Sequence, residues 1–212
     1  TIRNEGTMTI TGGTVSNDSG SESEWSGSSL VCNGASNAAT LNITGGTFQQ
    51  DNFIVIKNDE YGTLNLSGGT VTSNTQAVQN WCNATISGGD LTGDVTSWTY
   101  LSTSATTTIS GGDINGDLSA VKLTYNNTSA TNKPVVNISG TANISGKISV
   151  GTQIFNQDNS YQDDATAADI SITGGTFTVK PDDSYLGTGL AFIGNEGGPW
   201  TVGVADGMEA SA

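Results

Sequence analysis

Histidine is absent from the 212 residues, and cysteine occurs only twice. Without histidine, the chain can carry neither a Ser-His-Asp nor a Cys-His catalytic arrangement. Cys32 and Cys82 form no Cys-x-x-Cys pair, which together with the missing histidine excludes the usual zinc sites. In the repeat alignment given below they lie two repeats apart, beyond the roughly 7 Å between Cα atoms that a disulfide allows. We therefore expect free, buried thiols.

Positive charge is also scarce, with 6 basic against 20 acidic residues and a formal net charge of −14. The basic residues are scattered and form no patch. Nucleic-acid binding requires Lys and Arg against phosphates, and anionic membrane surfaces attract basic segments, so neither partner is expected. A uronate lyase is disfavoured as well, because Arg3 is the only arginine that could neutralise a substrate carboxylate.

Long apolar runs are missing too. No stretch of 18 apolar residues could span a membrane, and no sustained 3.6-residue apolar period predicts helices. The 29 glycines could indicate disorder, but the apolar residues recur in short ordered runs. Thr favours strands, whereas Ser, Asn and Gly favour turns, so the composition predicts an all-β chain. It opens inside a repeat, and we expect it to be part of a larger chain.

A repeated phrase is the strongest signal in the sequence. It alternates apolar and polar residues, continues with Thr/Ser-Gly-Gly, and ends on Thr or Asp and another hydrophobic residue. The copies occupy 8–15, 41–48, 64–71, 84–91, 107–114 and 170–177, with a weaker copy at 136–141. A second phrase, a hydrophobic residue followed two positions later by Asn, occurs at 2–4, 31–33, 56–58 and 78–80. It returns at 193–195 and predicts a further repeat there.

The phrases predict strands that turn at Gly-Gly. Leu64 and Leu66 should point inward and Asn65 and Ser67 outward, because side chains alternate along a strand. Glycine reaches backbone angles closed to other residues, and Val71 then points inward again. One such coil cannot bury its apolar side alone, whereas stacked parallel coils bury a continuous narrow core.

We therefore predict a single-stranded parallel β-helix, a solenoid, over residues 1–180. Residues 181–212 would form a terminal rung or cap, or lead into a following domain. The wider gaps between copies require loop insertions between rungs, at 18–29, 124–133 and 157–168. A β-sandwich is the main alternative, but sandwiches lack one phrase that recurs at this pace.

The Thr/Ser-Gly-Gly-Thr-hydrophobe phrases resemble the pectate-lyase-like parallel β-helix repeats of large surface proteins of Gram-positive gut commensals. The resemblance covers about residues 2–179 and leaves a divergent tail. It implies a right-handed helix, a location on the extracellular bacterial cell surface and an adhesin-type role. The same architecture carries lyases, glycosidases and adhesins, so the activity has to be argued from the site.

A doubled acidic phrase is the sharpest local feature, because residues 89–95 recur as residues 112–118. On neighbouring rungs, Asp90 would stack on Asp113 and Asp94 on Asp117. Three interpretations stay open. The carboxylates could accept backbone amides in turns, Asp90 and Asp113 could hold Ca²⁺, or all four could serve as catalytic carboxylates of a glycan hydrolase.

Aromatic residues suggest a ligand surface. Trp98 and Tyr100 follow Asp94 closely, Trp81 lies one turn earlier, and Trp25 sits in an acidic, Ser-rich loop. Aromatic faces stack on sugar rings. The alternative is that these rings cover the core or shield an edge.

Taken together, the sequence predicts a non-catalytic extracellular segment of a bacterial surface protein, an adhesin or stalk. Host or plant glycans or glycoproteins are the expected partners, and no cofactor is expected apart from the Ca²⁺ considered above. The alternative is a glycan-active hydrolase on a β-helix that uses the stacked aspartates. Phage-like fibres, ice binding and a pure spacer complete the range of functions.

Overall fold

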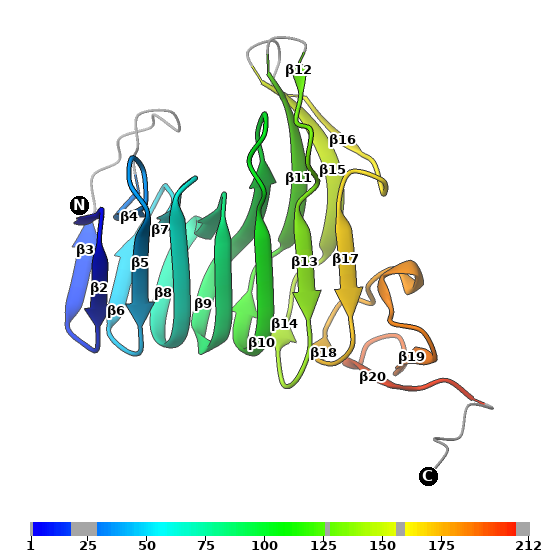
Figure 1. Cartoon of the computed structure of the whole chain (residues 1–212). Helices are drawn as coiled ribbons and strands as arrows, with labels where there is room; N and C mark the ends of the chain where they lie inside the picture. Colours follow the sequence, from blue (N-terminus) through cyan, green and yellow to red (C-terminus); the bar gives the residue numbers. More distant parts are fainter. Residues whose placement is uncertain (1, 18–28, 126–127, 156–159, 207–212) are drawn as a thin grey trace.

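The computed structural model describes residues 2–17, 29–125, 128–155 and 160–206. They form an all-β chain with a long, mostly parallel sheet (Figure 1). Within these residues the only helical element is the short 3-10 turn η1 (Asp183–Tyr185). The prediction of an all-β chain is confirmed.

Most of the described strands pair in three parallel ladders, which we call the first, second and third. One strand from each ladder, in chain order, makes a level. The first ladder comprises β1 (Ile2–Asn4), β4 (Val31–Asn33), β7 (Ile56–Asn58), the C-terminal parts of β8 (Gly62–Asn80) and β9 (Asn83–Thr99), β11 (Leu118–Tyr125) and β15 (Ile148–Phe155). The second comprises β2 (Thr7–Ile10), β5 (Ala39–Ile43), the N-terminal parts of β8, β9 and β10 (Thr106–Asn115), β13 (Val135–Ile138) and β17 (Asp169–Ile172). The third comprises β3 (Thr14–Asn17), β6 (Thr47–Gln50), the middle of β8 and β9, the end of β10, β14 (Asn143–Ile144) and β18 (Thr176–Phe177).

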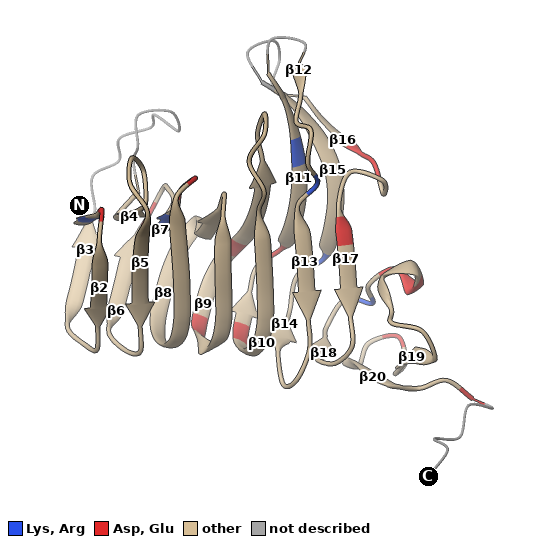
Figure 2. Cartoon of the chain, in the orientation of Figure 1, with Lys and Arg blue, Asp and Glu red and all other residues tan. Residues whose placement is uncertain are grey.

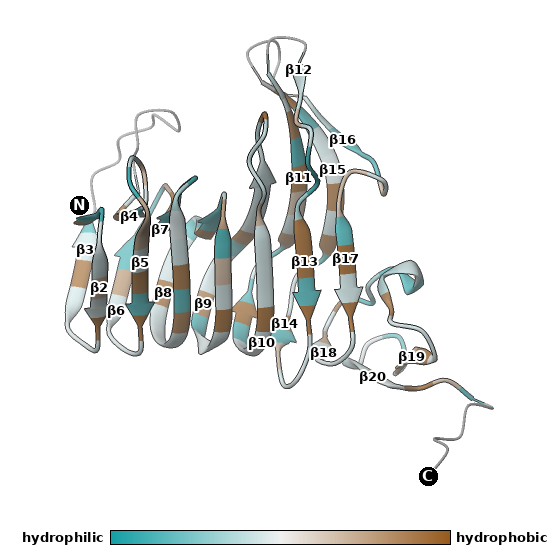
Figure 3. Cartoon of the chain, in the orientation of Figure 1, coloured by the Kyte–Doolittle hydropathy of each residue, from teal (hydrophilic) through white to brown (hydrophobic). Residues whose placement is uncertain are grey.

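This register stacks each apolar position on its counterpart one level away. Leu64 pairs with Ala84 and Leu66 with Ile86, and all four are buried. Asn65 and Ser67 are exposed, whereas Val71 is buried, as the alternation predicts. Figure 3 shows the hydrophobic positions recurring at corresponding heights of successive strands. One narrow core therefore runs through the levels.

The Gly-Gly turns are required both by backbone angle and by space. Gly69 has φ +98°, in the region that favours glycine. A Cβ placed there would lie 2.8 Å from the carbonyl oxygen of Gly46, one level away. The turns of adjacent levels thus approach too closely for any side chain at this position.

Asparagine side chains form a hydrogen-bonded ladder inside the core. Nδ2 of Asn4 donates to Oδ1 of Asn33 at 2.7 Å, Asn33 to Asn58 at 2.8 Å, and Asn58 to Asn80 at 2.8 Å. Asn80 then donates to the hydroxyl of Thr107 at 2.9 Å, where the row of asparagines ends. These asparagines are the third residues of the second sequence phrase. Because their amides also donate to nearby backbone carbonyls, the buried polar groups are satisfied.

The parallel pairing gives way to antiparallel pairing towards the C-terminus. β20 (Trp200–Val204) pairs antiparallel with both β18 and β19 (Leu190–Ile193). The prediction that a further parallel repeat begins at Ile193 is therefore wrong. The ring of Phe192 packs edge-on against Phe177, 5.7 Å between centroids, so the hairpin covers the end of the core.

Two of the three expected insertions contain short antiparallel strands. β12 (Thr128–Ser129) pairs with the end of β11, and β16 (Tyr161–Asp163) pairs with β15. Figure 1 shows these segments projecting beyond the parallel ladders. The expected insertion at 18–29 lies almost wholly outside the described residues.

Candidate binding groove

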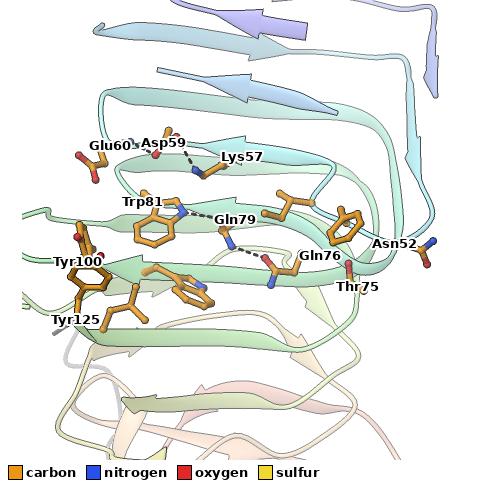
Figure 4. Close-up of a pocket in the computed structure, with 14 residues that line it drawn as sticks. Asn52, Lys57, Asp59, Glu60, Thr75, Gln76, Gln79, Trp81, Tyr100 and Tyr125 are labelled. Atoms are coloured by element: carbon orange, nitrogen blue, oxygen red, sulfur yellow. Dashed lines mark hydrogen bonds and ion pairs between the residues drawn. The ribbon is translucent and has the colours of Figure 1, made fainter. Parts of the chain in front are cut away.

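A groove of about 360 Å³ lies on the outer side of the first ladder. It crosses the levels that contain β7, β8, β9 and β11, and the segment between β6 and β7 closes one end. Figure 4 shows its side chains reaching out from neighbouring strands. The lining residues are Asn52, Phe53, Ile54, Lys57, Asp59, Glu60, Thr75, Gln76, Gln79, Trp81, Trp98, Tyr100, Leu123 and Tyr125.

Strand alternation aims the aromatic rings at the groove. On β9, Ser97 and Thr99 are buried, and Trp98 between them points the other way. Tyr100 follows two positions later and lines the groove beside Trp98. Trp81 comes from the preceding level, directly after Asn80 of the asparagine ladder.

The aromatic rings contact one another and make one continuous wall. The centroids of Trp81 and Trp98 lie 5.5 Å apart with a 38° tilt. Tyr100 stands edge-on to Trp81 at 6.3 Å and to Tyr125 at 5.5 Å. Such mutual packing holds the rings in place, and it leaves a broad apolar surface for a ligand.

Polar groups continue the groove beyond the aromatic wall. Trp81 Nε1 donates to Gln79 Oε1 at 2.7 Å, and Gln79 Nε2 donates to Gln76 Oε1 at 3.0 Å. Lys57 Nζ lies 2.9 Å from Asp59 Oδ2 and 5.7 Å from the Trp81 ring centroid. An apolar wall with a few oriented polar groups is the usual composition of small-molecule sites.

Burial and neighbouring groups shift acidity around the groove. Desolvation, followed by the proximity of Tyr125 and Glu60, raises the pKa of Tyr100, so its phenol stays neutral at physiological pH. Burial and the Asp59 carboxylate raise the pKa of the Cys32 thiol. Burial also raises that of Cys82. Both thiols are free, as predicted, but half-buried rather than fully buried.

The predicted stacking of Asp90 on Asp113 is present, because they are register partners of β9 and β10. Both side chains are exposed on the outer side of the third ladder, and Figure 2 shows these neighbouring acidic positions. Asp113 Oδ1 accepts a hydrogen bond from Asn143 Nδ2 at 2.8 Å. Neither residue lines the groove.

Asp94 and Asp117 act as backbone acceptors. Asp94 Oδ1 accepts the N–H of Asp117 at 2.9 Å, and Asp117 Oδ1 accepts the N–H of Lys147 at 2.9 Å. Burial raises the pKa of Asp94, and the hydrogen bond from the Asp117 amide opposes this shift. Each carboxylate therefore joins one level to the next, which is the turn role weighed for them from the sequence.

The described residues contain no group of three or more His, Cys, Asp or Glu side chains placed to hold a metal ion. The Ca²⁺ site at Asp90 and Asp113 stays a prediction. The catalytic role of Asp90, Asp113, Asp94 and Asp117 stays a prediction too.

Three of the four predicted aromatic residues meet in the groove: Trp81, Trp98 and Tyr100. Trp25 lies outside the described residues. The sequence analysis did not single out Gln76, Gln79 or Tyr125. One signal was available for Gln79, since aligning the second phrase places it one level from Lys57 on the same face.

No family model, curated protein or solved structure matches this chain. The part of the chain that the structure describes has no helix with the length and hydropathy of a membrane-spanning segment.

Proposed function

We propose that this chain is a right-handed, single-stranded parallel β-helix that binds glycans through the groove on its first ladder. It would serve as a non-catalytic adhesin or stalk segment of an extracellular bacterial surface protein. The observation that carries the binding role is the joint placement of Trp81, Trp98, Tyr100 and Tyr125 in one groove with oriented amides.

Three features support the solenoid architecture. The ladders are parallel over consecutive levels, the hydrophobic residues stack on one another, and the Asn4 to Asn80 row runs through the core. Stacked repeats that contact only their neighbours produce this pattern. A crystal structure with two separate facing sheets, or with a left-handed path between levels, would overturn the proposal.

The non-catalytic assignment rests on where the acidic residues are. Asp94 and Asp117 each accept a hydrogen bond from a backbone N–H. Asp90 and Asp113 lie on the third ladder and do not line the groove. A glycosidase needs its two carboxyl groups on either side of the scissile bond. In the groove, Asp59 is paired with Lys57, which leaves Glu60 as the one carboxylate among the lining residues without an ion pair in the described part of the chain.

Binding is tested with labelled protein on a broad glycan panel, with calcium and again with EDTA. Wild type and Tyr161→Ala, an exposed tyrosine outside the groove, should be retained on the same glycans. Trp98→Ala should lose this retention while keeping the circular dichroism spectrum of the wild type. Equal retention of Trp98→Ala and wild type would contradict a binding role for the groove.

The hydrolase alternative is favoured by one observation, the direct register pairing of Asp90 and Asp113. It predicts release of reducing sugar from a glycan, and its loss in the double variant Asp90→Asn, Asp113→Asn. Under the adhesin proposal, the wild type releases none and the double variant binds as the wild type does.

A further inference from the structure

The hydrogen bonds at the polar end of the groove run in a single forced direction. An indole N–H can only donate, so Trp81 Nε1 requires the oxygen of Gln79 as its acceptor. The nitrogen of the Gln79 amide therefore faces Gln76, and the side-chain oxygen of Gln76 accepts a hydrogen bond from it. The hydroxyl of Thr96 also donates to this oxygen at 3.4 Å.

The consequence is that Gln76 presents its NH₂ group as an available donor. Among the described residues, Nε2 of Gln76 has no hydrogen-bond partner, and Figure 4 shows Gln76 at the opposite end of this chain of bonds from Trp81. A ligand in the groove therefore meets a donor whose orientation is already fixed. It has to offer an acceptor oxygen there, which a hydroxyl, ether or carbonyl group supplies.

The charges of the groove select against a negative ligand. Lys57 is held by Asp59 at 2.9 Å and lies over the Trp81 ring, so its charge is already compensated. Glu60 is exposed at the rim and forms no ion pair within the described residues. The net charge of −14 adds a repulsive field at longer range. A carboxylate or sulfate entering the groove would meet uncompensated negative charge.

We infer that the groove takes a neutral rather than an acidic oligosaccharide, with one sugar ring stacked on the Trp98 side of the aromatic wall and an oxygen of the chain accepting from Gln76. The inference rests on the proposed function and names the ligand class of the same groove. The groove runs across several levels, with Tyr100 and Tyr125 at one end and Thr75 and Asn52 at the other (Figure 4), so it is open to a chain of sugars.

The test uses three immobilised tetrasaccharide classes of equal length: neutral hexose, N-acetylhexosamine and hexuronate. The wild-type chain should be retained on one or both neutral classes and pass through the hexuronate column. Gln76→Glu keeps the shape of the side chain but replaces the donor by a charged acceptor. We expect it to weaken retention on the neutral class roughly tenfold or more.

Gln49→Glu is the matched control, because it makes the same change at an exposed position of β6 outside the groove. It should be retained as the wild type is. Glu60→Gln provides a second readout, since it should raise the ratio of acidic to neutral glycan retention.

The other outcomes divide clearly. Preferential retention on hexuronate, lost in Trp98→Ala, would overturn the neutral ligand while leaving the glycan-binding role intact. Neutral retention that survives Gln76→Glu unchanged would overturn the role of the donor. No retention on any glycan would overturn the proposed function, and the ligand class with it.

Discussion

Trp81 and Trp98 come from adjacent levels, and their ring centroids lie 5.5 Å apart at a tilt of 38°. The contact exists because β8 and β9 stack in register and both rings point away from the core. A ligand that covers one ring therefore changes the surroundings of the other as well. Four predictions follow from this contact and from the architecture that creates it.

Ligand binding should be visible in tryptophan fluorescence. A bound neutral tetrasaccharide should shift the emission and protect it from acrylamide, because it removes water and quencher from the aromatic wall. Trp98→Phe should lose most of this protection. Trp200→Phe, which alters a tryptophan of the C-terminal hairpin, should retain it. Equal protection of both variants would place the ligand elsewhere.

Asn58→Ala should destabilise the chain strongly. Asn58 accepts from Asn33 and donates to Asn80 and to the carbonyls of Gly62 and Asn83. Its removal leaves buried partners unsatisfied, and we expect a loss of about 3 kcal/mol or more in the free energy of unfolding. Urea unfolding followed by circular dichroism measures the difference.

Asn65→Ala is the control for that variant. Asn65 also donates to an asparagine one level away, at 2.9 Å from Asn42, but on the exposed outer side of the second ladder. Its loss should cost less than about 1 kcal/mol, because water replaces the missing partner. Similar losses of unfolding free energy for Asn58→Ala and Asn65→Ala would show that burial does not determine the stabilising effect of the inner row.

Gly69→Ala should cost more than Gly13→Ala, although both glycines have positive φ. At Gly13, where nothing lies within 4 Å of an added Cβ, only the backbone strain of about 1–2 kcal/mol applies. At Gly69, the contact with Gly46 O forces the levels apart and should add roughly 1 kcal/mol or more. Gly112→Ala, with a Cβ 2.9 Å from Gly89 O, should behave as Gly69→Ala does. Equal losses of unfolding free energy in Gly13→Ala and Gly69→Ala would mean that the positive φ angle alone, and not the contact with Gly46, destabilises the variants.

Asp94→Asn should raise the midpoint of urea unfolding at neutral pH. The folded chain holds the pKa of Asp94 above its ordinary value, chiefly through burial, so ionisation of this group destabilises the folded state above that pKa. Asparagine keeps an oxygen for the Asp117 amide and removes the charge. As the pH falls through the raised pKa, the wild type takes up a proton and the advantage of the variant should disappear.

An Asp94→Asn variant that is less stable than the wild type at neutral pH would contradict this reasoning. Asp113→Asn is a suitable comparison, since Asp113 is exposed and bonded to the Asn143 side chain. The Asp113→Asn substitution should change the midpoint of urea unfolding only slightly at neutral pH.

The register between neighbouring levels was predictable because the repeated phrases can be aligned with one another in the sequence. The match of residues 89–95 with 112–118 places Asp90 beside Asp113, and the structure confirms that register. Alternation likewise identifies Leu64 and Leu66 as core. These features repeat in the sequence, so each copy reinforces the assignment of the others.

The groove was only partly predictable, because its walls come from positions that differ between copies. Gln76 belongs to the turn between the third and first ladders, and Tyr125 to a strand extension before an insertion. Neither belongs to a repeated phrase. The hairpin of β19 and β20 misled the sequence analysis for the opposite reason, since Ile193 and Asn195 match the second phrase but the chain folds back antiparallel.

The row from Asn4 to Asn80 has a direction, since every side chain gives its nitrogen to the next level and takes the nitrogen of the one before. A duplicated level inserted within this row would bring one donor and one acceptor, and would leave no buried amide unpaired. Duplication of whole levels would therefore lengthen the molecule without leaving a buried amide of this row unsatisfied. Beyond Ser97, whose hydroxyl accepts from Thr107 at 3.0 Å, the inner position of the first ladder becomes Ala120, and lengthening depends on apolar packing instead.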